Sequence, residues 1–137
     1  MKSWKLLACL SVTLLCGSLR AQNVITANIP FNFELGRTTL PAGEYRIEQV
    51  KQGLLRWHCF AARSGAMILT MPTSGGQRRT AGMLHFNRYG ETYFFAGVDL
   101  PYNGDGAVVE RTKREKELAR RITTGETTGV AFSMPKK

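Results

Sequence analysis

His58 and Cys59 are adjacent in the chain, and an imidazole beside a thiol is the pairing that activates a cysteine nucleophile. Both residues lie in the segment 54–60, whose composition predicts a β-strand. Neighbouring side chains on a strand point to opposite faces, so the imidazole is not expected to reach the thiol. We therefore predict that Cys59 is a buried thiol that packs as a small apolar side chain.

Histidines are also the most common protein ligands for transition metals, and the chain has two, His58 and His85. They fall in different predicted strands, and a metal site would need at least one more ligand at the same depth. Cys59 is expected on the face opposite His58, so it does not supply that ligand. The pattern predicts no metal site and no other cofactor.

The segment 103–106, Asn-Gly-Asp-Gly, shares part of the pattern of a calcium-binding loop. The full loop would need an acidic residue at position 101 and a glutamate at position 112. The chain has Pro101 and Thr112 there, and no helix is expected before the segment. We interpret 103–106 as an ordinary turn rich in Gly, Asn and Asp.

The acidic side chains are few and scattered, and none belongs to a phosphate loop, a zinc-protease motif or a serine nucleophile motif. A pair of carboxylates for glycoside hydrolysis can be assembled from distant strands without a sequence signature. The alternative of a small hydrolase-like enzyme therefore stays open. The carboxylates available to it are Glu34, Glu44, Glu48, Glu91, Asp99 and Asp105.

Basic residues gather at Arg78-Arg79 and along the segment 111–121. In the second cluster Glu110, Glu115 and Glu117 interleave with the bases, which is typical of a solvated helix face with ion pairs. Aromatic residues lie in predicted strands rather than beside these bases. The pattern does not indicate nucleic-acid binding.

The first 21 residues predict a secretory signal peptide. A short cationic start, 1–5, precedes an apolar run, 6–19, and Ala21 suits the last position before cleavage. The run is too short for a comfortable membrane span, which needs about 20 residues. A lipid anchor on Cys16 is disfavoured because the bulky Leu15 precedes it. A retained N-terminal helix is the third alternative.

Cleavage after position 21 would leave residues 22–137 as a single β-rich domain. This part contains 16 basic and 10 acidic residues, a net charge of +6, and Cys59 as its one cysteine. A lone cysteine excludes an intramolecular disulfide framework. The positive charge favours anionic partners without specifying one.

Apolar alternation then predicts the elements that must position these residues. Strands are expected at 25–35, 44–50, 54–60, 66–71 and 127–134, with 66–71 buried on both faces. Thr112 and Glu115 form a capping box that begins a short helix over 113–121. The fold class is all-β: a compact sandwich or barrel of about seven or eight mostly antiparallel strands with one short C-terminal helix.

Asn87-Arg88-Tyr89-Gly90 predicts a hairpin with a type I turn, in which Gly90 is a left-handed bulge residue and Asn87 pairs with Glu91. This register assigns two sets of side chains to the two faces of the hairpin. The expected core face carries Leu84, Phe86, Phe94, Ala96 and Val98. The other face carries His85, Tyr93 and Phe95, and is aromatic enough to be covered by a second layer or a partner.

Four segments in this order, 29–33 (IPFNF), 40–45 (LPAGEY), 84–90 (LHFNRYG, followed by Tyr93-Phe94) and 113–119 (KREKELA), resemble a family of small, uncharacterised exported proteins of soil bacteria. The resemblance extends over most of the chain after position 21. It implies that these segments belong to one exported domain. It carries over no activity and no site residue.

The sequence thus predicts an exported, noncatalytic β-domain that has a binding or structural role in the cell envelope. An anionic envelope polymer or another protein chain is the expected partner, and no transmembrane span is expected after position 21. A hydrolase-like enzyme and a subunit of a homo-oligomer are the alternatives. No catalytic, cofactor-binding or metal-ligating residue is assigned.

Overall fold

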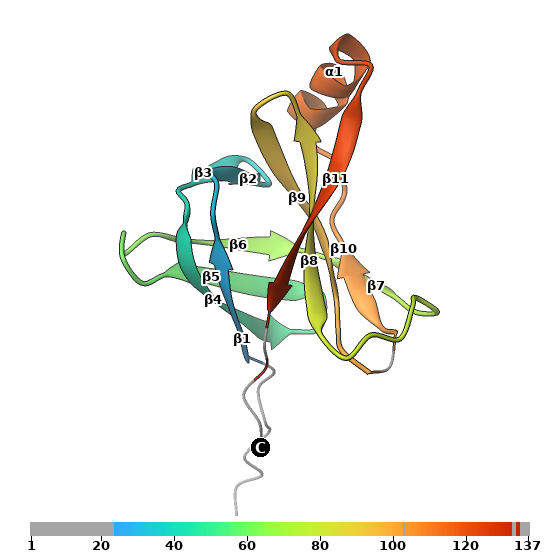
Figure 1. Cartoon of the computed structure of the whole chain (residues 1–137). Coiled ribbons are helices and arrows are strands. Elements are labelled where there is room, and N and C mark those ends of the chain that lie inside the picture. Colours follow the sequence, from blue (N-terminus) through green and yellow to red (C-terminus); the bar gives the residue numbers. More distant parts are fainter. Residues whose placement is uncertain (1–23, 103, 133, 135–137) are drawn as a thin grey trace, which may run out of the picture.

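The alternating apolar pattern folds into two curled β-sheets that enclose one core (Figure 1). The computed structural model describes residues 24–102, 104–132 and 134, and the expected signal peptide lies outside them. These residues form eleven strands and one helix. The elements are β1 (Val24–Ile29), β2 (Phe33–Leu35), β3 (Thr38–Leu40), β4 (Gly43–Lys51), β5 (Leu54–Cys59), β6 (Gly65–Leu69), β7 (Met71–Thr73), β8 (Gly82–Tyr89), β9 (Thr92–Asp99), β10 (Gly106–Val108), α1 (Lys113–Arg121) and β11 (Gly125–Phe132).

The first sheet has the strand order β1-β4-β5-β6, and the second has the order β11-β8-β9-β10-β7. The β2–β3 hairpin joins the second sheet through one parallel pairing, Glu34 with Phe94. The two sheets approach each other where β1 lies beside β11, and β6 leads into β7 through Thr70 alone. The expected all-β sandwich with one short helix is confirmed.

The strands outnumber the expected seven or eight because several are short. The alternating segment 25–35 is divided into β1 and β2 around Pro30, which has no N–H to donate to a ladder. Three-residue strands also form where no strand was predicted, as at β3 and β10. The last strand, β11, begins at Gly125 and ends at Phe132, whereas the alternation predicted 127–134.

Aromatic rings fill the space between the sheets. Trp57 is fully buried, with its ring centroid 4.7 Å from that of Phe95 and 5.4 Å from that of Phe33. Phe33 also meets the rings of Tyr45 and Phe86 at 5.3 Å, in edge-to-face geometry. Such contacts add to the stabilisation from apolar burial.

The predicted register of the β8–β9 hairpin is wrong. Tyr89 pairs with Thr92 across a two-residue loop, so Asn87 lies opposite Phe94 rather than Glu91. Gly90 has φ +63°, whereas Glu91 has a negative φ, and this combination is typical of a type II′ turn. Glycine at the first loop position therefore selects a tighter turn than the one we predicted.

The predicted faces of β9 are also partly wrong. The register shifts by one residue between His85 and Phe86, which leaves Ala96 without a counterpart on β8. Phe95 therefore faces Phe86 within the core, while Phe94 is buried on the opposite side of the sheet, against Tyr89. Leu84, Phe86 and Val98 lie in the core as expected.

The segment 66–71 was expected to be buried on both faces, and this is wrong as well. Ile68 is buried, but Met67 and Leu69 are 60% and 73% exposed. Both lie on β6, the last strand in its sheet, where nothing covers the outer face within the described residues. The predicted strand also ends early: Met71 belongs to a separate strand, β7, and Pro72 is accommodated because β7 is an edge strand as well.

Candidate functional site

A basic groove runs between the β2–β3 hairpin and the start of α1. It is a partly enclosed depression of about 620 Å³. The hairpin contributes Arg37, and the first turn of α1 with the segment before it contributes the other cations. The groove residues are Glu34, Gly36, Arg37, Glu110, Arg111, Thr112, Lys113, Arg114 and Lys116. Five cations against two carboxylates give this groove a positive charge.

The turn of the hairpin brings Arg37 to the groove. Leu35 pairs with Thr38, so Gly36 and Arg37 form a two-residue loop. Gly36 has φ +61°, a conformation that glycine adopts without steric cost and that a β-carbon would strain. Glycine at this position therefore allows the tight turn that exposes the arginine beside it.

α1 forms the other wall, and its bounds, Lys113–Arg121, are those that the sequence predicts. Thr112 caps the helix by accepting a hydrogen bond from the Glu115 N–H at 3.2 Å. The reciprocal half of the expected capping box is replaced by other contacts. The Glu115 carboxylate faces the sheet, where it accepts hydrogen bonds from Asn87 Nδ2 at 2.8 Å and the Tyr89 hydroxyl at 3.3 Å.

Two buried carboxylates lie beneath the groove, each near one of its arginines. Glu34 is 7% exposed, and its Oε1 lies 2.9 Å from Arg114 Nη1. Glu115 is 3% exposed, and its Oε1 lies 3.8 Å from Arg111 Nε. The prediction that Glu115 belongs to a solvated helix face is therefore wrong. A guanidinium held at hydrogen-bond distance by a fixed carboxylate loses less freedom when it binds a ligand, so the Glu34 contact preorganises Arg114, while Arg111 is only in the vicinity of Glu115.

The other three cations of the groove have no ion-pair partner within the part of the chain that the structure describes. Arg37, Lys113 and Lys116 are exposed and form no ion pair with any residue that the structure describes. At the other end of α1, Arg120 and Arg121 are also exposed, but they do not line the groove. Three unpaired cations beside two further arginines are suited to binding an extended anion.

The buried hydroxyl of Tyr89 is expected to make the stability of the fold depend on pH. Burial, and then the nearby Glu115 carboxylate, raise the pKa of Tyr89 above its ordinary value of 10.0. The unfolded chain therefore loses this proton near pH 10, while the folded chain keeps it. We expect the free energy of unfolding to fall as the pH rises above about 10.

The check is the denaturation midpoint measured from pH 8 to pH 11 for the wild type and for Tyr89→Phe. The phenylalanine variant cannot ionise at this position, so its midpoint should fall less steeply above pH 10. Parallel pH profiles for the two proteins would contradict the proposed role of the Tyr89 proton.

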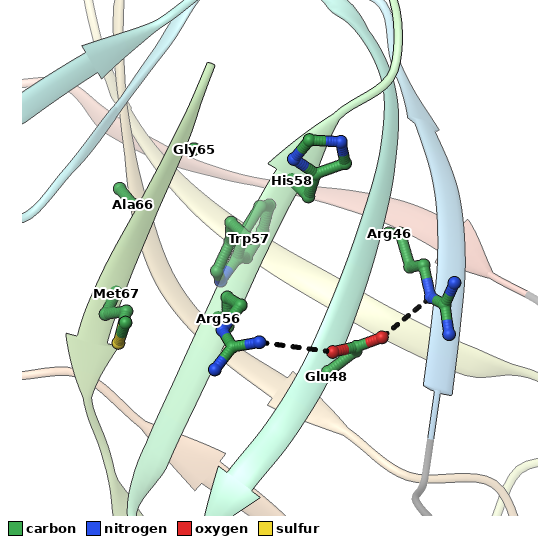
Figure 2. A pocket seen from close by; sticks show the side chains of 8 residues that line it. All are labelled: Arg46, Glu48, Arg56, Trp57, His58, Gly65, Ala66 and Met67. Atoms are coloured by element: carbon green, nitrogen blue, oxygen red, sulfur yellow. Dashed lines mark ion pairs between the residues drawn. The ribbon is translucent and has the colours of Figure 1, made fainter. Parts of the chain in front are cut away.

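A second depression, of about 530 Å³, lies on the outer face of the first sheet. Figure 2 shows the guanidinium groups of Arg46 and Arg56 converging on Glu48, at 2.8 and 3.9 Å. His58 and Met67 flank them, and Gly65 leaves a gap at the end of β6. Its charges are largely satisfied among themselves, so it is less suited to a free anion than the basic groove.

The histidines and the cysteine do not come together. Cys59 is fully buried while His58 is exposed on the opposite face, as predicted from the strand geometry. His85 lies in the other sheet, where its Nε2 is 2.7 Å from Asp99 Oδ2. Among residues 24–102, 104–132 and 134, no three or more His, Cys, Asp or Glu side chains are grouped to hold a metal ion.

The candidate acids are divided among separate contacts. Glu34 is bound by Arg114, Glu48 by Arg46, and Asp99 by His85. Asp105 belongs to the connection between β9 and β10, and its carbonyl oxygen accepts a hydrogen bond from the Leu100 N–H. Position 103 of the suspected calcium loop lies outside the described residues.

The basic groove could not be found from the sequence because its walls are distant segments. The basic run 111–121 was visible, but Arg37 lies in a turn with no basic neighbour. The two walls are brought together by the parallel contact of β2 with β9, by the packing of α1 on β8 through Glu115, and by the ion pair between Glu34 and Arg114. The other basic pair, Arg78-Arg79, is exposed and does not line the groove.

In the part of the chain that the structure covers, no helix has the length and apolar character needed to span a membrane. Comparison with known proteins finds no matching family model, no similar curated protein and no similar solved structure.

Proposed function

We propose that this protein is an exported, noncatalytic binding domain that holds an anionic polymer of the cell envelope in its basic groove. The observation that carries the proposal is the cluster of Arg37, Lys113 and Lys116, which have no ion-pair partner among the described residues. Arg114, held by the buried Glu34 at 2.9 Å, adds an oriented guanidinium group, and Arg111 adds a further cation.

The shape of the groove favours a polymer over a small molecule. Sites for small ligands are concave and bury most of the ligand surface. This groove is only partly enclosed, and its cations extend from the turn of the β2–β3 hairpin to the first turn of α1, so a chain can lie across it with its charges spaced along them. Repeated carboxylates or phosphates provide that chemistry.

The hydrolase alternative has less support. Of the two carboxylates that line the groove, Glu34 is already bound by Arg114 at 2.9 Å. Glu115 lies beneath, turned towards Asn87 and Tyr89. A general acid or base must reach the substrate within hydrogen-bond distance, and Glu34 and Glu115 face the protein instead. Glu110, the other carboxylate that lines the groove, is exposed, but no second free carboxylate among the groove residues completes a catalytic pair with it.

The proposal predicts binding of polygalacturonate, a polymeric carboxylate, or of long-chain polyphosphate, with little affinity for the corresponding monomers. Replacing Arg37 and Lys113 together by glutamine should weaken binding of the polymer by about fivefold to tenfold. The measurement is titration calorimetry at about 0.15 M ionic strength, where distant charges are screened.

The matched control is Arg120→Gln with Arg121→Gln, which removes the same total charge from the last turn of α1, outside the groove. This variant should bind nearly as well as the wild type. Equal losses in both double variants would indicate attraction by net charge alone, and the absence of binding to either polymer would refute the groove as a polymer site.

Export is a separate part of the proposal. The cationic start, apolar run and small residue at position 21 support a mature chain that begins near Gln22, outside the cytoplasm. Amino-terminal sequencing of the protein purified from its native cells tests this. Recovery of intact Met1 from the cytoplasm would contradict export.

A further inference from the structure

Beyond the basic groove, the free edge of β6 is a surface of a different kind. β6 pairs with β5 on one side, and no other described strand pairs with it. Edge strands present unpaired backbone N–H and C=O groups, and proteins usually protect them with charged residues, prolines or bulges. The five residues of β6, Gly-Ala-Met-Ile-Leu, contain no charged residue and no proline.

The hydrogen bonds to β5 identify the groups on the free edge. The Cys59 N–H donates to the Ser64 carbonyl, and the Thr70 N–H donates to the Gly53 carbonyl, each at 2.8 Å. In an antiparallel ladder, alternate residues direct their backbone groups to the same neighbour. The even-numbered residues of β6 therefore direct their backbone N–H and C=O groups to β5. The backbone N–H and C=O groups of Gly65, Met67 and Leu69 point towards the open edge.

Those three residues also share the outer face. Met67 and Leu69 extend into solvent, while Gly65 leaves a gap next to His58 in the depression of Figure 2. Glycine is required there, because a β-carbon would lie 2.7 Å from the Trp57 carbonyl oxygen. The strand thus carries a projecting leucine and, four residues away, a gap without a side chain.

We propose that the β6 edge pairs with β6 of a second copy of this chain, antiparallel and around a two-fold axis at Met67. Met67 then exchanges two hydrogen bonds with Met67 of the partner subunit, and Gly65 lies opposite Leu69 of the partner subunit. The projecting leucine of each subunit fills the gap beside the glycine of the other. The interface is self-complementary, as a two-fold contact must be.

The charges near the edge permit this pairing. Arg56 is the cross-strand neighbour of Met67, and its guanidinium already lies near Glu48. In the dimer, the backbones carrying the two copies of Arg56 would be three strand spacings apart, about 14 Å. That distance exceeds the screening length at physiological salt, about 8 Å, so repulsion between the subunits is small.

The test is sedimentation equilibrium of the chain in the form that its cells accumulate. We expect a reversible dimer, with Leu69→Lys weakening association by about tenfold or more, because each two-fold interface contains the substitution twice. Tyr102→Lys is the matched control, since Tyr102 is as exposed as Leu69 (72% against 73%) and belongs to the connection between β9 and β10 of the other sheet. It should leave the dimer intact.

Disulfide trapping tests the register itself. Residues in a hydrogen-bonded pair have Cα atoms about 5.5 Å apart, within the range that a disulfide spans. Met67→Cys should form a covalent dimer on mild oxidation, whereas Tyr102→Cys should not, and the buried Cys59 should not interfere. A strictly monomeric protein, or a dimer that survives Leu69→Lys and gives no Met67→Cys crosslink, would overturn the proposal.

Discussion

Replacing Trp57 by alanine should lower the free energy of unfolding by about 3–5 kcal/mol. The indole is fully buried and touches the rings of Phe33, Tyr45 and Phe95, which come from both sheets. Its removal leaves a cavity that these rings, fixed on separate strands, can fill only in part. Chemical denaturation of the variant and the wild type measures the loss.

Trp57→Phe is the informative companion variant. The indole N–H is buried and has no hydrogen-bond partner among the described residues. Phenylalanine keeps most of the ring contacts and removes this unpaired donor, so its cost should be clearly smaller than that of alanine. If phenylalanine proved as destabilising as alanine, a bonded indole N–H would be indicated instead.

Glu115→Ala should cost about 2–4 kcal/mol, which is unusual for a residue on a short, highly charged helix. The variant leaves Asn87 Nδ2 and the buried Tyr89 hydroxyl without their acceptor, and it frees Arg111 from its ion pair. Docking of α1 on the outer face of β8 depends on these contacts. The loss should appear in thermal or chemical denaturation.

Glu117→Ala is the control on the same helix, since Glu117 is exposed. It should leave stability nearly unchanged, and Glu115→Gln, which keeps one oxygen acceptor, should fall between the two alanine variants. Equal stability of the two alanine variants would mean that the carboxylate does not hold the helix.

Local signals in the sequence were sufficient for the helix. Thr112 caps it, the apolar residues are few, and the predicted bounds agree with the structure. The direction of Glu115 could not be predicted, because its partners Asn87 and Tyr89 lie on a strand distant in sequence. Capping-box geometry competes with tertiary contacts, and here the tertiary contacts prevail.

Strand positions were predictable from alternation, but pairings and faces were less so. At the β8–β9 hairpin a two-residue turn at Gly90 competes with the longer turn that we predicted, and the register depends on that choice. The displaced Ala96 then moves Phe95 into the core. A bulge of this kind cannot be predicted from the alternation of apolar and polar residues.

The wrong prediction that 66–71 is buried on both faces has a similar cause. A short apolar run is consistent with burial on both faces, and nothing within it indicates that the sheet ends there. Likewise, the basic groove needs the β2–β3 hairpin beside the start of α1, and no periodicity in either segment indicates the other. Fold class follows from composition and alternation, whereas a site assembled from distant segments follows from topology.

The meeting of β1 with β11 has a consequence for how the chain is made. These strands lie near opposite ends of the described chain, and β2 and β9 are similarly distant in sequence. Proteins dominated by such distant pairings fold in milliseconds to seconds, because the entropy of closing a large loop is lost before the stabilising contacts form. β1 can pair with β4 early, but the two sheets close around the core only when β11, the last strand, is present. If the chain is exported as we propose, its core would stay open until its carboxyl end leaves the translocation channel, so newly delivered molecules would depend on chaperones or rapid dilution to avoid aggregating.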